Sequence, residues 1–282
     1  MTRFVSYDGT ALAYQGAATG QVLVCLPGGP ARNPVYLGDL GGLGEAAGRS
    51  LVMLETRGTG ASAVPEDNAT YRCDRQAGDV EALREHLGLD QLDLLAHSAA
   101  ANVAILYAAR YPERIRRLVL LTPSLRAVGL MLAPGGERRE ALARRRTEPW
   151  YPAAVEAFHA AEAGQDSVGN LKKYAPFYYA RWDEAAQAHA TLGLEPRAFL
   201  IGARFYGRGA FDPEATKAAL AKLEAPVLIY AGELDIIPTP ELAAQAVPFF
   251  PHAELVVHRG AGHMAWLDDP GPLAATIARF LG

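Results

Sequence analysis

Short apolar segments alternate with helix-forming segments over most of the chain, and this alternation limits the fold more than any other feature. Apolar runs end abruptly in glycine-rich loops, as in "VLVCL" before "PGGP" and "SLVMLE" before "TRGTGAS". Between such runs, "DVEALREHLG" places Val80, Leu83 and Leu87 on one helical face. Buried strands that alternate with helices predict an α/β fold with a mostly parallel sheet and helices on both of its faces.

The same pattern predicts where the elements lie. The Asp8-Gly9-Thr10 step between two alternating apolar runs indicates a hairpin at the start of the chain. The predicted strands fall in residues 3–7, 11–16, 22–26, 50–55, 91–97, 115–123, 226–235 and 253–263. The predicted helices of this core fall in residues 79–88, 99–112, 239–247 and 269–282.

The alternation stops after Pro123. Residues 124–223 are helical and aromatic in character, without convincing strands. A chain of 282 residues is long enough to bury a large core and to carry an insertion. We therefore expect an α/β core built from residues 1–123 and 224–282, interrupted by a helical cap at 124–223.

Composition excludes several classes of function. A net charge of -4 and a pI near 6.0 do not predict a nucleic-acid partner. The local basic run is interpreted as a solvated helix face; it comprises Arg138, Arg139, Arg144, Arg145 and Arg146. Cys25, Cys73 and the histidines lack metal-ligand spacing, so we expect no disulfide, metal or other cofactor, and a small-molecule substrate.

The opening residues "MTRFVSYDGT" lack the apolar core of a secretory signal. No apolar run approaches the roughly 20 residues that a membrane span needs. We therefore expect a soluble cytoplasmic protein that does not act at a membrane, and the sequence leaves its oligomeric state open.

Candidate catalytic residues follow three of the predicted strands. Ligands bind at the carboxyl ends of strands in such sheets, and Ser98, Asp235 and His263 each lie just past one. A serine hydroxyl needs a base to take its proton, and histidine titrates close to neutral pH. Asp235 would fix the tautomer of His263 and stabilise its charged form. The order Ser, Asp, His is the order found in α/β-hydrolases.

Ser98 has a second interpretation, as a mere N-cap of the helix that follows it. A nucleophile on a sharp strand-to-helix turn requires small neighbours, and G-x-S-x-G is the usual pattern. Here Ala96 and Ala100 stand in place of the glycines, and Ala99 and Ala101 are also small. We therefore interpret Ser98 as the nucleophile and the adjacent His97 as structural.

An acyl-transfer site also needs donors for the oxyanion. The N–H of Ala99, directly after Ser98, is one candidate. Pro27 and Pro30 have no N–H, so Gly29 is the best donor in "PGGP", and Pro30 is expected to hold it in an extended conformation.

Aromatic residues of the insertion are candidates for the substrate pocket, although most are expected to form the insertion's own core. The pocket candidates are Trp150, Tyr178, Trp182 and Phe205.

Together these residues resemble the α/β-hydrolase superfamily along nearly the whole chain. "PGGP", "ETRGTGAS", "DVEALREHLGLDQLDLLAHS", "GELD" and "GAGH" are most similar to its proline iminopeptidase-like branch. The resemblance implies an α/β-hydrolase fold with a cap domain. In the branch's aminopeptidases an acidic residue that holds the substrate amine can directly follow the triad aspartate; here Ile236 stands there, and Glu184 and Glu195 are the alternatives.

The sequence thus predicts a serine hydrolase that cleaves a small ester or amide, including peptide-like substrates, through an acyl-enzyme. Two alternatives remain open: a lyase, acyl transferase or natural-product tailoring enzyme on the same fold, and a catalytically silent ligand-binding protein.

Overall fold

The computed structural model describes residues 1–132, 136–165 and 168–282. Its centre is an eight-stranded sheet with the strand order β1-β2-β4-β3-β5-β6-β7-β8. The strands are β1 Thr2–Val5, β2 Ala11–Gln15, β3 Val22–Leu26, β4 Ser50–Glu55, β5 Leu92–His97, β6 Ile115–Leu121, β7 Val227–Gly232 and β8 Ala253–His258.

The sheet is mostly parallel, as the sequence predicted. β1 pairs antiparallel with β2 and β2 with β4, whereas the neighbours from β4 to β8 run parallel. The predicted hairpin at Asp8-Gly9-Thr10 is confirmed, with Gly9 at a φ of +85°. The central strands β3 and β5 are buried throughout, which explains their uninterrupted apolar sequences.

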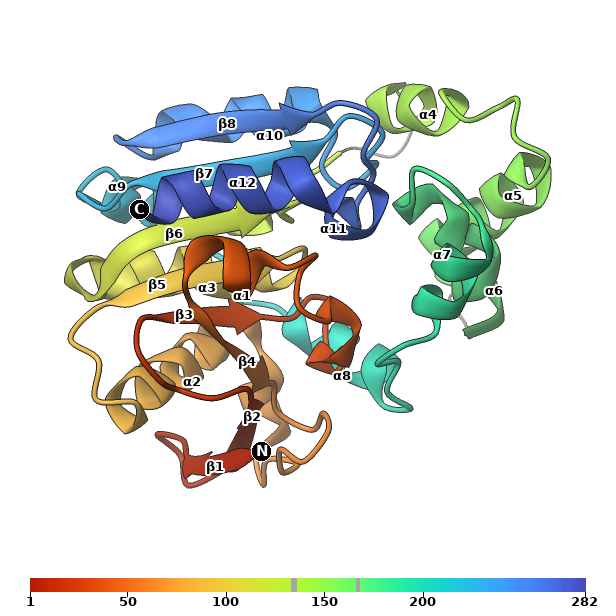
Figure 1. The fold of residues 1–282 in the computed structure, drawn as a ribbon. Coiled ribbons are helices and arrows are strands. Elements are labelled where there is room, and N and C mark those ends of the chain that lie inside the picture. Colours follow the sequence, from red (N-terminus) through yellow and green to blue (C-terminus); the bar gives the residue numbers. More distant parts are fainter. Residues whose placement is uncertain (133–135, 166–167) are drawn as a thin grey trace.

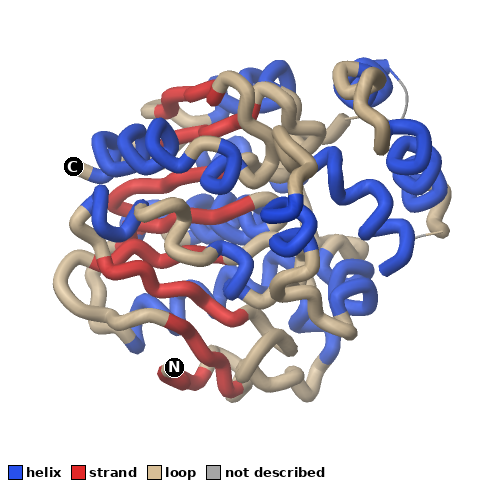
Figure 2. The backbone as a smooth tube through the Cα atoms, turned by 45° about the vertical axis from the view of Figure 1, so that its right-hand side comes forward, coloured by secondary structure: helices blue, strands red, loops and turns tan. Residues whose placement is uncertain are grey.

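Helices cover both faces of the sheet, and Figures 1 and 2 show the strands as a layer between them. α1, α11 and α12 pack on one face through Leu43, Trp266 and Ile277. On the other face α2, α3, α10 and α9 (Pro213–Leu220) contribute to the core. The helices of the core are α1 Leu43–Ala47, α2 Cys73–His86, α3 Ala100–Arg110, α10 Pro240–Ala246, α11 Ala265–Asp268 and α12 Pro270–Leu281, with short 3-10 turns η1 Pro34–Leu37, η2 Asn68–Tyr71, η3 Pro112–Arg114 and η6 Val247–Phe249.

The long segment between β6 and β7 is helical in the part that the structure describes. Its elements are η4 Arg126–Val128, α4 Gly136–Ala143, α5 Tyr151–Glu162, α6 Val168–Tyr174, η5 Ala175–Tyr178, α7 Glu184–Ala190, α8 Ala198–Phe205 and α9 Pro213–Leu220. Figure 1 shows α4 to α7 gathered beyond the ends toward which β6 to β8 point.

This inserted segment has two kinds of packing. A separate apolar cluster joins α4, α5 and η5 through Leu142, Phe158 and Phe177. The two ends of the inserted segment instead pack in the main core. Val128 of η4 does so at one end, and Phe205 of α8 and Leu220 of α9 at the other.

Among the described residues, no helix has the length and apolar character needed to cross a membrane.

Candidate active site

Ser98 lies on the sharp turn that joins β5 to α3. Its φ of +55° is rare for a residue with a side chain and costs on the order of 1–3 kcal/mol. Backbone hydrogen bonds hold the turn: the Ser98 N–H donates to the Leu121 carbonyl at 3.0 Å, and the Ser98 carbonyl accepts from the Ser124 N–H at 3.0 Å. A strained conformation fixed in this way presents the Ser98 side chain at the carboxyl edge of the sheet.

Small residues make room for this turn. Ala96 and Ala100 are buried on either side of Ser98. From the facing loop, Gly28 approaches so closely that a Cβ there would lie 2.8 Å from Ser98 Cβ and 2.9 Å from the His97 carbonyl oxygen. The glycine at position 28 is therefore required by contact with the serine turn.

Asp235 and His263 are joined by a buried hydrogen bond. His263 Nδ1 lies 2.8 Å from Asp235 Oδ2, and the other carboxylate oxygen, Oδ1, accepts from the Ile237 N–H at 2.7 Å. Because an ionised carboxylate only accepts, His263 donates from Nδ1 and its Nε2 is left with a lone pair. Asp235 is fully buried and His263 nearly so.

His97 is held by a hydrogen-bonded chain that begins at the glycine loop. The Gly28 N–H donates to the Tyr36 hydroxyl at 2.7 Å, and this hydroxyl lies 2.6 Å from His97 Nδ1. His97 Nε2 lies 3.3 Å from the His263 carbonyl oxygen, which can only accept. The chain therefore places the proton of His97 on Nε2 and makes the Tyr36 hydroxyl a donor to Nδ1.

Burial lowers the pKa of His97 well below its ordinary value, and the neighbouring His263 lowers it further. His97 is 1% exposed. Its ring packs against those of His263 and Trp266, with centroids 4.8 Å and 4.9 Å away. A neutral His97 thus donates from Nε2 to the backbone carbonyl of His263 and helps to hold that residue in place. This agrees with the structural role predicted for His97.

The two predicted oxyanion donors border the same space. Gly29 and Ala99 both line the cavity that contains Ser98. Within the described part of the chain, neither N–H donates a hydrogen bond. The expected extended conformation of Gly29 is wrong: its φ is +123°, a value that only glycine adopts readily.

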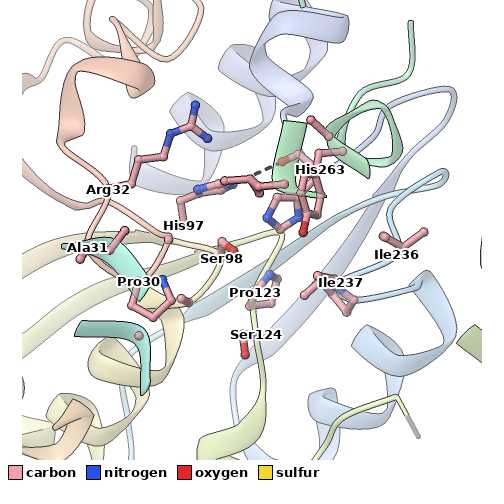
Figure 3. A pocket seen from close by; sticks show the side chains of 18 of the residues that line it. Pro30, Ala31, Arg32, His97, Ser98, Pro123, Ser124, Ile236, Ile237 and His263 are labelled. Carbon is pink, nitrogen blue, oxygen red and sulfur yellow. Dashed lines mark hydrogen bonds between the residues drawn. The ribbon is translucent and has the colours of Figure 1, made fainter. Parts of the chain in front are cut away.

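A cavity of about 670 Å³ lies above the carboxyl ends of the central strands. Ser98 and His263 both line it, and Figure 3 shows Ser98 between Pro30 on one side and His263 and Ile237 on the other. Among the described residues no hydrogen bond yet joins Ser98 to His263. In ligand-free enzymes such contacts are often long and tighten only when substrate binds.

Of the four aromatic residues predicted for the pocket, Tyr178 lines this cavity, with its ring centroid 5.4 Å from that of His263. The other three lie outside its lining. Trp150 packs on Phe177 at 5.2 Å and Trp182 packs on Tyr179 at 5.4 Å. Phe205 is buried in the main core. All three side chains therefore pack against other residues of the protein.

Several lining residues were not singled out from the sequence. Pro123 and Ser124 follow β6, and Ile237 follows the loop of Asp235. The strand-end rule that identified Ser98 would also have found Pro123 and Ser124.

The basic run at residues 138–146 is only partly a solvated helix face. Arg145 is buried and donates to the carbonyls of Tyr179 and Ala180 at 2.7 Å and 2.9 Å.

Cys25 and Cys73 are both free and buried, and burial raises the pKa of each thiol. Among the described residues, no group of three or more His, Cys, Asp or Glu side chains is arranged to hold a metal ion.

Comparison with known proteins gives a consistent result. A family model described as alpha/beta hydrolase fold matches residues 21–270. The chain is 26% identical over 272 residues to a proline iminopeptidase of Levilactobacillus brevis, covering 92% of this chain and 87% of that protein. It is 27% identical over 267 residues to a proline iminopeptidase of Lactobacillus delbrueckii subsp. bulgaricus, covering 90% and 88%.

Solved structures share the fold. An esterase from Exiguobacterium antarcticum superposes with a TM-score of 0.77 at 20% identity, covering 99% of this chain and 98% of that one. A proline iminopeptidase from Mycobacterium smegmatis gives a TM-score of 0.73 at 20% identity, covering 99% and 97%.

Proposed function

Because this chain belongs to the α/β-hydrolase fold family, we propose that it is a serine hydrolase that cleaves a small ester or amide through an acyl-enzyme. The observation that carries the proposal is the shared cavity of Ser98 and His263. Ser98 has the strained φ of a nucleophile turn, and His263 is oriented by Asp235. A mere N-cap would require neither the strain nor the histidine.

In the first half of the reaction, Ser98 Oγ attacks the substrate carbonyl carbon while His263 Nε2 takes the hydroxyl proton. Asp235, hydrogen-bonded at 2.8 Å, stabilises the imidazolium that forms. The bond to the leaving group then breaks, and the leaving group takes the proton from His263. The acyl group remains as an ester on Ser98.

In the second half, water attacks this ester. His263 takes a proton from the water, the acid is released, and the proton returns to Ser98 Oγ. Both tetrahedral intermediates carry a negative oxygen, for which the unpaired N–H groups of Gly29 and Ala99 are the donors in this proposal. Ala99 is buried, and buried backbone donors without partners are rare, which supports this use of its N–H. Gly29 is exposed, and its place in the cavity lining supports the second donor.

The inserted segment, residues 124–223, is the cap of the proposed enzyme. It contributes Tyr178, Tyr206 and other residues to the cavity wall. The core would then supply the reaction and the cap the choice of substrate, with domain limits at 1–123, 124–223 and 224–282.

Covalent labelling tests the nucleophile. A fluorophosphonate should modify the protein once, at Ser98, as measured by mass spectrometry of the intact chain and its peptides. Ser98→Ala should abolish labelling, whereas Ser124→Ala, at another serine that lines the cavity, should retain it. A folded protein that is not labelled, or is labelled elsewhere, would contradict the proposal.

The structure of the labelled protein tests the oxyanion donors. The phosphoryl oxygen should lie about 3 Å from the nitrogens of both Gly29 and Ala99. If that oxygen instead faced solvent or other donors, the assignment of Gly29 and Ala99 would be wrong while Ser98 remained the nucleophile.

A further inference from the structure

More positively charged than negatively charged side chains line the cavity in the described part of the chain. Among the described residues that line it, three are arginines, Arg32, Arg126 and Arg138, and one is a carboxylate, Glu195. A cavity with an excess of one charge concentrates ligands of the opposite charge.

Three of these four charged groups already form an ion pair or hydrogen bonds with other groups of the protein. Arg138 Nη1 pairs with Glu162 at 2.5 Å. Arg32 donates to the carbonyls of Leu192 and His189 at 2.9 Å and 3.0 Å, and in Figure 3 its guanidinium points away from Ser98. Glu195 Oε1 accepts from the Gly60 N–H at 2.9 Å.

Arg126 is different. Its guanidinium lies 4.4 Å from the centre of the Tyr206 ring, and within the described residues no carboxylate forms an ion pair with it. Stacking on an aromatic face holds a guanidinium in place and leaves its N–H fork free for a bidentate acceptor. Arg126 also follows closely on Ser124, whose N–H is bonded to the carbonyl of Ser98.

The wall beside Asp235 offers nothing to a cationic substrate. Ile236 is buried and apolar, and Ile237 lines the cavity next to it. Glu184, one of the two carboxylates considered for a substrate amine, is exposed and lies outside the cavity lining. Among the described residues that line the cavity, a substrate amine would meet one carboxylate, Glu195, which already accepts from the Gly60 N–H.

We propose that the substrate is an ester or amide that carries a carboxylate, and that Arg126 binds this carboxylate. This inference rests on the proposed serine hydrolase and names its substrate class. The apolar residues Leu125, Leu130 and Leu132, which line the cavity on either side of Arg126 in the sequence, fit the hydrocarbon that separates the two polar ends.

Two pairs of substrates, each a carboxylate and its own methyl ester, test the proposal, with cleavage of the shared ester followed in each pair. Monomethyl adipate against dimethyl adipate varies the acyl side, and 4-acetoxybenzoate against its methyl ester varies the leaving group. In at least one pair, kcat/KM should favour the anion by roughly tenfold, as a charge-assisted hydrogen bond gives. The preference should weaken at high salt.

Variants link the preference to the residue. Arg126→Gln should remove it, and Arg126→Lys should restore part of it, because the charge returns without the planar fork. Arg139→Gln is the matched control, since Arg139 is an exposed cap arginine outside the cavity lining. Equal rates for anion and neutral ester in both pairs, or the same loss in every substrate for Arg126→Gln, would overturn the proposal.

Binding separates this proposal from the proposed function. Calorimetry on the Ser98→Ala protein should show monomethyl adipate or 4-acetoxybenzoate binding more tightly than its neutral partner, and Arg126→Gln should cancel the difference. If the intact protein hydrolysed nothing but this difference were present, the hydrolase would fail and the anion site would stand. If neutral esters were hydrolysed without any preference in rate or binding, only the anion site would fail.

Discussion

The backbone carbonyl of Tyr178, in the inserted segment, accepts a hydrogen bond from the N–H of His263 at 3.0 Å. The Met264 N–H donates to the same carbonyl at 3.2 Å. Asp268 strengthens this junction, because its Oδ1 accepts from Ala180 at 3.0 Å and its Oδ2 from Gly262 at 2.8 Å. The inserted segment, which contributes Tyr178 to the cavity lining, therefore also fixes the loop that carries the proposed base.

Asp268→Asn should loosen this junction. An asparagine amide can accept at only one of the two positions, so one buried N–H loses its partner at a cost of about 1–3 kcal/mol. We expect a lower free energy of unfolding in urea and a lower kcat on a small activated ester. Asp90→Asn is the control, since Asp90 is exposed and makes no side-chain hydrogen bond or ion pair among the described residues. Equal effects of the two changes would argue against the junction.

Ser98→Ala and His263→Ala should each lower kcat/KM by roughly 10⁴-fold or more, and the double variant should be little worse, because the residues act as a unit. Steady-state kinetics on an activated ester measure this. Additive losses in the double variant would show that the two side chains act independently.

Gly28→Ala should impair turnover through contact alone. Its Cβ would lie 2.8 Å from that of Ser98, and a displacement of about 1 Å at a nucleophile can cost about a hundredfold in rate. Gly271→Ala should be harmless, since its nearest neighbour would lie 4.0 Å away. Both are compared by kcat/KM and thermal unfolding; unaltered kinetics in a folded Gly28→Ala protein would show that the loop can move aside.

Tyr178→Ala and Trp182→Ala should differ in kind. Tyr178 lines the cavity, so its loss should change the ratio of kcat/KM between long and short acyl esters. Trp182 lies outside the lining and packs on Tyr179, which does line the cavity, so its loss should lower stability and change that ratio much less than the loss of Tyr178. A selectivity change in Trp182→Ala as large as in Tyr178→Ala would contradict the lining described above.

His97 should make stability fall in mild acid. Its folded-state pKa is lowered, so below its ordinary pKa of about 6.5 the unfolded chain takes up a proton that the folded chain refuses. The stability that a neutral His97 contributes is therefore complete above about pH 6.5 and is lost as the pH falls below it, by at most about 1.4 kcal/mol per pH unit.

His97→Gln should remove this part of the pH dependence. Urea unfolding at about pH 7 and pH 5.5 should show the difference between the two values shrink by about 1 kcal/mol in the variant. If the difference kept its full size, other groups would account for the loss of stability in acid.

The sequence alone was enough to predict the sheet and the residues at its edge. The central strands β3, β5 and β7 are short apolar runs that are buried along their whole length, so the local sequence is enough to predict them. Parallel strands end at one edge, so residues that follow strands were expected to lie together there. Ser98 and His263 do line one cavity, and Asp235 is hydrogen-bonded to His263.

The lining of the cavity was decided only by tertiary structure. A helical aromatic segment looks the same whether a ring faces a cavity or a neighbouring helix, and only packing distinguished Tyr178 from Trp150, Trp182 and Phe205. Packing also decided the surroundings of the arginines. Arg145 is buried against backbone carbonyls, whereas Arg126 lines the cavity and stacks on Tyr206. Which face of a helix is covered depends on partners distant in sequence, and local periodicity does not encode them.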